Sequence, residues 1–389
     1  MRGFWGVLVC TALLLVGLGG SAGAVTISVS GPQEMVYDWS TQQCEVEDIP
    51  DLPAHAFRDG LGRTQLTLSL YTSHRMIGPD LNNLVHDCQV TLASDRDPLP
   101  SNYDDADWLA APYALPTGEV YALVHDEYHG AEHPGGCPSG VFGQCRYNTV
   151  TLARSVTNGD TFQRYPSPPG NLVASMPYQY VPDAGRVGVF EPSNIIQKDG
   201  LYYAFVLVSR AFEGQEAGAC LMRTSDLSDP KSWRAWDGQG FTVRFIDPYR
   251  ETGEPFTRST CKPVDPEDVK LAESVVYDTA VNKYLLVGGE AKYDPALSKN
   301  VWGFYYTTSD DLIHWSPRQL IMPVQRFQNH QCGDPDPLVY PSFIDPNSTD
   351  RNYSTAGSTA YVYYTRFNYV NCQLGFDRDL LRTPITISP

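Results

Sequence analysis

The sequence has no Cys-x-x-Cys pair, no second long apolar run after its first residues, few basic side chains and few helix signals. It carries 28 Lys and Arg against 45 Asp and Glu, a formal net charge of −17 at pH 7. This charge argues against nucleic acid and anionic membranes as partners, because both require a basic face. The missing Cys-x-x-Cys pair argues against a zinc site.

The first residues have the pattern of a secretory signal peptide. Arg2 is followed by the apolar stretch "FWGVLVCTALLLVGLGG" and then by "SAGA", with small residues at Ala22 and Ala24. A positive start, an apolar middle and an A-x-A end predict cleavage near Ala24. The alternative is an uncleaved membrane anchor. Because no later segment approaches the ~20 apolar residues of a membrane span, residues 25–389 are expected to form a soluble, secreted protein, extracellular or periplasmic.

Eight cysteines remain once Cys10, inside the apolar stretch, is set aside. An even number in an exported chain indicates disulfides rather than metal ligands. Cys137 and Cys145 share the Gly-rich loop "GGCPSGVFGQC" and are expected to pair with each other. The other pairings stay open, and we predict no metal site and no cofactor.

The chain repeats one pattern five times: a short strand, a turn with Asp, Gly or Asn, and an apolar, aromatic-rich strand. The units are "DLPAHAFRDGLGRTQLTLS", "ADWLAAPYALPTGEVYALVH", "VGVFEPSNIIQKDGLYYAFVLV", "AESVVYDTAVNKYLLVGG" and "YPSFIDPNSTDRNYSTAGSTAYVYYTRF". Four of the units carry an acid near the start of the first strand: Asp51, Asp107, Glu191 and Glu273. Ser-Asp turns that lead into aromatic strands follow most units.

These units predict an all-β protein, a single five-bladed β-propeller with four-stranded blades. Strands such as "LYYAFVLV" are apolar on both faces, as expected for a blade held between two neighbours. The segments "VTISVS" or "EMVYDW" are expected to close the ring by pairing with the last blade. A pair of β-sandwiches is the alternative. Acids at the mouths of inner strands would converge on the central channel, because an unpaired charge in the hydrophobic core would be costly.

Three short motifs resemble those of five-bladed propeller glycosidases of glycoside hydrolase family 43, the arabinanase and xylosidase type. Glu191-Pro192-Ser193 precedes Asp199-Gly200 and Tyr202-Tyr203, as in the third blade of that family; Glu273 stands at its fourth-blade position and Asp51 at its first-blade position. The resemblance implies Asp51 as general base, Glu191 as the acid that orients the donor and tunes its pKa, and Glu273 as general acid, with inversion. Two departures, Glu in place of Asp at 191 and Ser after Glu273, indicate a divergent branch. A channel calcium ion is suggested by the family alone.

Glycoside hydrolysis needs one protonated carboxyl group and one ionised carboxylate, and grouping acids in one pocket separates their pKa values. The alternative for each of the three acids is a structural role, capping backbone amides. Glu127 is a further candidate that would replace one of the three in the mechanism.

The second unit contains the unusual stretch "YALVHDEYHGAEHPGG". We expect His125 and Glu127 to face the channel and to bind sugar hydroxyls, with Tyr128 stacking on the sugar. Metal binding by three His spaced four apart, or a plain surface loop, are alternatives. Further candidates for substrate binding are Arg58, His86, Asp107 and Trp108, although Trp108 is equally suited to core packing.

The predicted function is therefore a secreted, monomeric glycosidase that acts on a poly- or oligosaccharide. The alternatives are a carbohydrate-binding propeller without catalysis and an extracellular interaction module. Because one fold supports many functions, only the site can decide among them.

Overall fold

The computed structural model describes residues 24–208, 214–251, 258–264 and 271–389; the predicted signal peptide, apart from Ala24, lies outside these ranges. Within them the chain is almost entirely β. The helices are a single α-helical turn, α1 (Trp39–Gln42), and the 3-10 turns η1 (Gly130–Glu132), η2 (Phe142–Gln144), η3 (Pro230–Ser232) and η5 (Phe327–Asn329).

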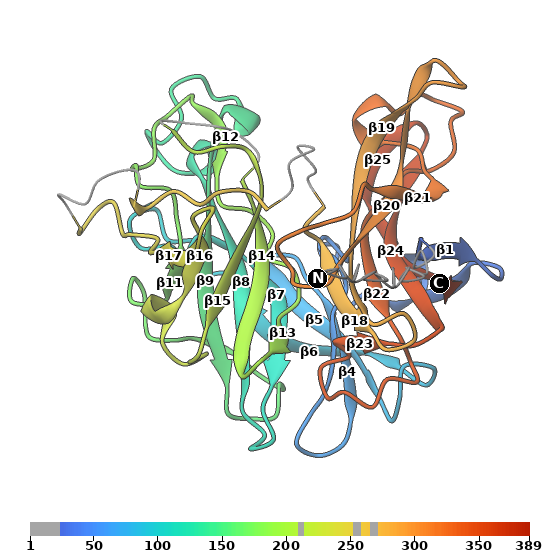
Figure 1. Ribbon diagram of the computed structural model, residues 1–389. Helices are drawn as coiled ribbons and strands as arrows, with labels where there is room; N and C mark the ends of the chain where they lie inside the picture. Colours follow the sequence, from blue (N-terminus) through green and yellow to red (C-terminus); the bar gives the residue numbers. More distant parts are fainter. Residues whose placement is uncertain (1–23, 209–213, 252–257, 265–270) are drawn as a thin grey trace, which may run out of the picture.

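The described strands form five sheets that follow one another along the chain (Figure 1). Sheet 1 contains β3 (Ala56–Arg58), β4 (Thr64–Leu68), β5 (Thr72–Gly78) and β6 (Val85–Ala93). Sheet 2 contains β7 (Ala106–Ala114), β8 (Val120–His129), β9 (Cys145–Ser155), β10 (Gln163–Arg164), β11 (Leu172–Ala174) and β12 (Gly185–Gly188). Sheet 3 contains β13 (Ile196–Lys198), β14 (Leu201–Val208), β15 (Gly218–Thr224), β16 (Arg234–Trp236) and β17 (Phe241–Val243).

Sheets 4 and 5 include strands from distant parts of the chain. Sheet 4 contains β18 (Ser274–Asp278), β19 (Lys283–Asp294), β20 (Lys299–Ser309), β21 (Gln319–Pro323) and β23 (Thr355–Ala356). Sheet 5 contains β22 (Leu338–Ile344), β24 (Thr359–Val370), β25 (Gln373–Ser388), β1 (Thr26–Val29) and β2 (Glu34–Tyr37). The prediction of four strands in every sheet holds for sheet 1 and is too low for the others, where short edge strands are added.

Each of the five predicted strand–turn–strand units is the hairpin, or the adjacent strand pair, at the start of one sheet. In sheet 3, Ile196 lies opposite Tyr203 and Lys198 opposite Leu201, so that Asp199 and Gly200 form a two-residue turn. Both turn residues have positive φ, 51° and 78°, as this kind of hairpin turn requires.

The hydrophobic cores lie between successive sheets. Separate buried clusters join sheets 1 and 2, 2 and 3, 3 and 4, 4 and 5, and 5 and 1. Alternate residues of β14 therefore serve two cores: Ala204 and Val206 pack toward sheet 2, and Tyr203 and Phe205 toward sheet 4. This explains why the strand is apolar on both faces, and the five clusters close the sheets into a ring.

The N-terminal strands complete sheet 5. Both β1 and β2 pair with β25 in antiparallel register, with Thr26 opposite Ser388 and Glu34 opposite Arg382. The prediction that a segment near residue 25 or 35 pairs with the last unit is confirmed, and both candidate segments do so.

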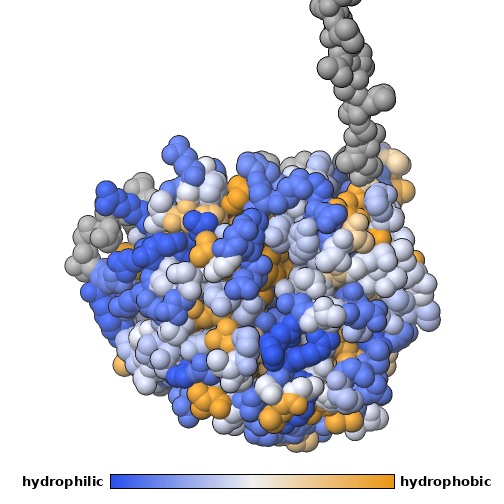
Figure 2. All heavy atoms as spheres, turned by 60° about the horizontal axis from the view of Figure 1, so that its bottom comes forward, coloured by the Kyte–Doolittle hydropathy of each residue, from blue (hydrophilic) through white to orange (hydrophobic). Residues whose placement is uncertain are grey.

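The eight cysteines form four disulfides: Cys44–Cys88, Cys137–Cys145, Cys220–Cys261 and Cys332–Cys372. The predicted Cys137–Cys145 pair is confirmed. Among the described residues, no helix has the length and apolar character to cross a membrane. The face shown in Figure 2 is largely hydrophilic, with hydrophobic residues scattered over it.

Candidate active site

A cavity of about 190 Å³, here called the central cavity, is lined by residues from four of the five sheets or from the loops that precede their strands. Its walls are Asp51, Leu52, Trp108, His125, Glu127, Arg146, Arg186, Glu191, Phe327, Tyr340, Phe367, Leu374 and Arg378. The cavity therefore brings together three carboxylates, three guanidinium groups and several aromatic rings from distant parts of the sequence.

Asp51 lies in the loop before β3, and its carboxylate accepts from three side chains. One oxygen contacts the Arg378 guanidinium and faces the Tyr340 hydroxyl at 3.4 Å; the other accepts from the Trp108 indole at 3.3 Å. A guanidinium contact favours the ionised form of a carboxylate. Asp51 thus presents a carboxylate paired with a guanidinium group at the cavity wall.

Glu191 occupies the loop between β12 and β13 with φ of 35°, a left-handed conformation that is rare for this residue type. Its backbone N–H donates to Nδ1 of His125 at 3.1 Å, and its carboxylate contacts the Arg186 guanidinium at 3.2 Å. Tyr340, across the cavity, also has positive φ, 58°. Residues in such conformations are found at functional sites as well as in turns.

Glu127 on β8 is a fully paired, buried carboxylate, only 1 % exposed. One oxygen accepts from His125 Nε2 at 3.2 Å and from Arg186 at 2.8 Å; the other accepts from His129 Nε2 at 3.1 Å and contacts Arg146. Because two guanidinium groups hold Glu127 as an anion, it is poorly suited to donate a proton.

Glu273 lies immediately before β18 and is partly buried. Its Oε2 accepts from the Gly289 N–H at 3.0 Å. Burial, with the negative charge of Glu191 as the next cause, raises the pKa of Glu273 well above its usual range. Glu273 is not part of the central cavity wall, so its link to the site is the electrostatic one with Glu191.

The site therefore holds carboxyl groups in two separate electrostatic environments. Asp51 is paired with the Arg378 guanidinium, whereas Glu273 retains its proton to a higher pH than an exposed glutamate because its pKa is raised. This separation is what acid–base hydrolysis of a glycosidic bond requires.

Six of the ten predicted site residues belong to this arrangement: Asp51, Glu191 and Glu273, and with them Trp108, His125 and Glu127. Trp108 is buried, 4 % exposed, and its ring lies edge-on to Tyr71 with centroids 5.1 Å apart. Only part of it reaches the cavity, so its packing role dominates.

The other four predicted residues lie elsewhere. Arg58 donates to the backbone carbonyls of Asp350 and Ser348, where it joins sheets 1 and 5. The His86 ring lies 3.2 Å from the Asp48 carboxylate, near the Cys44–Cys88 disulfide.

Asp107 and Tyr128 are correctly placed on β7 and β8 but do not face the cavity. Burial and neighbouring acids raise the pKa of Asp107, whose carboxylate contacts Arg164. Tyr128 donates to the Pro98 carbonyl and stacks on His133. Strand alternation gives the reason: His125, Glu127 and His129 share one face of β8, and Tyr128 lies on the other.

The sequence reasoning missed the cations of the site, Arg146, Arg186 and Arg378, and also Tyr340. Arg186 stands five residues before Glu191, in "GRVGVFEP". This closeness to a predicted site residue is the one feature of the sequence that could have indicated Arg186. Arg146 follows the disulfide residue Cys145, and no feature of the sequence near it indicates a role in the site.

The structure gives no support to the alternative of a three-histidine metal site. His125 and His129 both contact Glu127, whereas His133 contacts Asp105 at 2.8 Å. Within the described ranges, the groups with metal-ligand spacing both include disulfide-bonded cysteines, whose sulfurs are not thiolates.

A groove of about 600 Å³ adjoins the central cavity and shares Asp51 and Arg378 with it. Its other walls include Tyr71 and Arg96, whose guanidinium lies 4.8 Å from the Tyr71 ring centroid, and Glu132. Cavities that bind organic ligands typically measure roughly 300–1,000 Å³, so the two spaces together suit a ligand longer than the central cavity alone.

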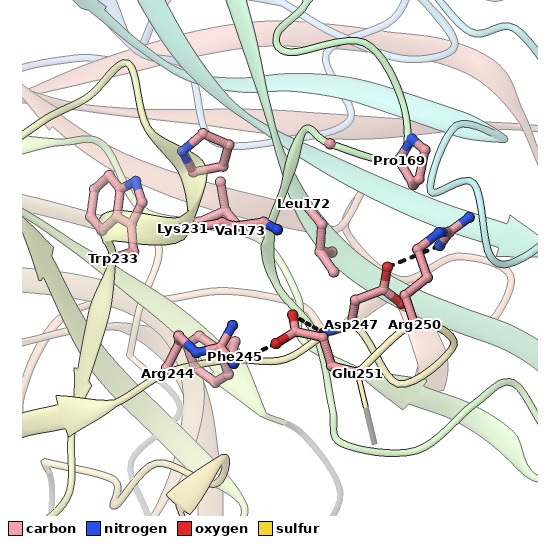
Figure 3. A pocket seen from close by; sticks show the side chains of 12 residues that line it. Pro169, Leu172, Val173, Lys231, Trp233, Arg244, Phe245, Asp247, Arg250 and Glu251 are labelled. Atoms are coloured by element: carbon pink, nitrogen blue, oxygen red, sulfur yellow. Dashed lines mark hydrogen bonds and ion pairs between the residues drawn. The ribbon is translucent and has the colours of Figure 1, made fainter. Parts of the chain in front are cut away.

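A separate cavity of about 120 Å³ contains none of the predicted site residues (Figure 3). Trp233 and Lys231 line one side; Arg244 pairs with Glu251, and Arg250 pairs with Asp247.

Comparison with known proteins gives fold-level likenesses. No protein family and no curated protein matches the sequence. Among solved structures, a protein of unknown function from Dyadobacter fermentans is 12 % identical, with 92 % of this chain and 99 % of that chain covered and a TM-score of 0.46.

Two enzymes of known structure show about the same degree of similarity to this chain. An exo-inulinase from Aspergillus awamori is 11 % identical over 90 % of this chain and 63 % of its own, with a TM-score of 0.48. A GH43_1 enzyme from Xanthomonas citri, solved with xylotriose, is 12 % identical over 86 % of this chain and 88 % of its own, with a TM-score of 0.47. Solved structures similar to this chain thus include glycosidases of the kind that its motifs resemble, but with such identities and TM-scores they assign it neither an activity nor a substrate.

Proposed function

We propose that this protein is a secreted glycoside hydrolase, a five-bladed β-propeller whose blades are the five sheets. Asp51 is the general base, Glu273 the general acid, and Glu191 the carboxylate that raises the pKa of the acid. The observation that carries the proposal is the contrast between Glu273, whose pKa is raised by burial and by Glu191, and Asp51, whose carboxylate is paired with the Arg378 guanidinium in the cavity wall.

The charge balance of the central cavity supports a neutral sugar as substrate. Its three carboxylates face three guanidinium groups, and the aromatic rings of Trp108, Phe327 and Phe367 offer apolar surface. The adjoining groove supports an oligomeric rather than a monomeric substrate. The four disulfides and the signal-peptide pattern support an extracellular or periplasmic location.

In this proposal Glu273 gives its proton to the leaving glycosidic oxygen. Asp51 takes a proton from water as that water attacks the anomeric carbon. Direct attack by water inverts the anomeric configuration, so proton NMR of the first product formed from a defined anomer is expected to show inversion.

The first test is hydrolysis of arabinans, xylans and aryl glycosides by the mature protein and by Glu273→Gln. The wild type is expected to turn over at least one substrate, and the variant to lose at least about 10²-fold in kcat, the usual minimum for a general acid. Glu216→Gln is the matched control, because Glu216 is an exposed partner of Lys262. Equal activity of the wild type and Glu273→Gln would assign the acid role to another residue.

One observation favours a second function, carbohydrate binding without hydrolysis: Glu273 stands outside the wall of the central cavity. In that case calorimetry would detect oligosaccharide binding by the wild type with no turnover. Asp51→Asn would then weaken binding, and Glu273→Gln would leave it unchanged. This result would overturn the glycosidase proposal.

A further inference from the structure

The wall of the central cavity contains a continuous chain of hydrogen bonds that ends on the backbone of Glu191. The Glu191 N–H donates to Nδ1 of His125 at 3.1 Å, and Nε2 of the same ring lies 3.2 Å from Oε1 of Glu127. Both His125 and Glu127 are buried, 2 % and 1 % exposed.

These contacts fix the proton of the His125 ring. A backbone N–H can only donate, so Nδ1 must be the bare, accepting nitrogen. The single proton of the neutral ring therefore lies on Nε2, where it is donated to Glu127. The opposite tautomer would place two N–H groups against each other at Glu191.

The surroundings keep this ring neutral. Burial lowers the pKa of His125 to about 3; Glu191 opposes the shift, whereas Arg186, Arg146 and His129 reinforce it. Glu127 also faces the ring, on its Nε2 side. The ring also stacks on Phe190, with centroids 6.5 Å apart. The tautomer is thus maintained throughout the range from about pH 4 to 8.

The accepting Nδ1 of His125 matters because it holds the backbone of Glu191 in an unusual conformation. Glu191 has φ of 35°, and a sparsely populated backbone conformation of a non-glycine residue is unfavourable unless its surroundings compensate. The hydrogen bond to His125 is such a compensation. It keeps the Glu191 carboxylate against Arg186 and near Glu273.

We propose that His125 and Glu127 are a positioning pair: Glu127 fixes the tautomer of His125, and His125 holds Glu191 in the left-handed conformation from which it acts on Glu273. Neither residue donates or accepts a proton during turnover. The effect of the pair on catalysis rests on the proposed function. The tautomer of His125 and its hold on the Glu191 backbone rest on the contacts alone. It also explains why Glu127, at first a rival for the catalytic set, is fully paired.

The structural part is tested by two-bond ¹H–¹⁵N correlation on protein labelled with ¹⁵N-histidine. The His125 signal is assigned as the one that disappears in His125→Asn, with His86→Asn as the matched control. A neutral ring with its proton on Nε2 from pH 8 to pH 4 is expected. A proton on Nδ1, or titration of His125 near pH 6.5, would overturn the proposal.

The catalytic part is tested with two substitutions of different chemistry. Asparagine places its Oδ1 where Nδ1 of histidine lies and preserves an acceptor for Glu191, whereas leucine fills similar volume without one. His125→Leu is expected to lower kcat about 10²-fold with little change in KM, the cost of a misplaced catalytic group. The basic limb of its pH–rate profile is expected to move to lower pH, because Glu273 keeps the burial that raises its pKa but loses the added effect of the Glu191 charge. His125→Asn should recover most of kcat and the wild-type limb.

A merely structural role would lower stability in both variants and leave the pH profile in place, and that result would overturn the proposal. If the wild type hydrolyses nothing, the proposed function fails, and the pair is then judged without activity. In that case the infrared carbonyl band of protonated Glu273, identified with Glu273→Gln, is followed against pH. Its titration should move to lower pH in His125→Leu and stay in place in His125→Asn; equal titration in both variants would overturn the proposal.

Discussion

His55 is a second buried histidine whose proton position follows from a single contact. Its Nδ1 lies 2.9 Å from the Ala110 carbonyl oxygen, so this nitrogen carries the hydrogen. Burial lowers the pKa of His55 to about 4. Unfolding exposes the ring to water, where its pKa returns to about 6.5.

His55 therefore makes the protein less stable in acid. Between pH 6.5 and 4 the unfolded chain binds a proton at this ring that the folded chain does not. The contribution of the neutral His55 ring to the free energy of unfolding is complete above pH 6.5. Well below pH 6.5, down to about pH 4, this contribution falls by about 1.4 kcal/mol per pH unit. In His55→Asn the amide still donates to Ala110 and does not titrate. Urea unfolding at pH 7, 6 and 5 is expected to show the wild-type advantage shrinking by about half of that amount from pH 7 to 6 and by nearly all of it from pH 6 to 5; a constant difference between the two proteins would contradict the assignment.

At the same scale, the sequence singled out the acids of the candidate site but not its cations. Asp51, Glu191 and Glu273 each precede the first strand of a repeating unit, so the repeat itself aligned them. The sequence of Arg146 and Arg186 carries no such pattern. They meet at Glu127 because a strand that no local signal predicts places them there.

That strand, β12 (Gly185–Gly188), lies parallel to β9 and puts Arg186 directly opposite Arg146. Like charges in opposed positions are destabilising, but Glu127 on the next strand, β8, accepts from both. The approach of β12 depends on Gly188, which has φ of 121° and comes so close to Asn148 that an added Cβ would lie 2.1 Å from its carbonyl oxygen.

Gly188→Ala is accordingly expected to displace β12 and to disturb Arg186 and Glu191 beyond it. The clash and the positive φ should lower the free energy of unfolding by at least roughly 1–3 kcal/mol, and any hydrolytic activity or sugar affinity should fall with it. Gly143→Ala is the matched control, because an added Cβ there meets no atom within 4 Å. Chemical denaturation and calorimetry measure both effects. Equal stability of the two variants would show that β12 tolerates a side chain at this position.

Element prediction succeeded for the strand pair that opens each sheet. The hairpin β13–β14 is an example, because Asp199 and Gly200 specify its turn and the two apolar faces of β14 specify its burial. The parallel pairs β12–β9 and β18–β23 escaped prediction, since their partners lie far apart along the chain. Short edge strands of this kind are held by backbone hydrogen bonds, which leave little trace in side-chain pattern.

At the scale of the whole molecule, the ring closes where the two ends of the described chain meet. Strand β1 pairs with the last residues of β25, from Thr26 opposite Ser388 to Val29 opposite Ile385. Ile27 packs in the core between sheets 4 and 5, and its N–H donates to the Tyr306 hydroxyl of sheet 4 at 3.2 Å. A single short strand thus ties both sheets together, and its loss affects the core shared by both.

Ile27→Ala tests this closure. Removing a buried isoleucine side chain costs about 2–5 kcal/mol, and more where the surroundings cannot collapse into the space; here the cavity would open between two sheets. Val29→Ala is the control on the same strand, because Val29 is 43 % exposed, and it should cost much less. Hydrogen exchange adds a local readout: the amides of residues 385–388 on β25 should lose protection in Ile27→Ala, while those of β14 in sheet 3, across the ring, keep theirs. If β1 were an appended strand with no part in closure, the two variants would be equally stable and β25 would exchange as in the wild type.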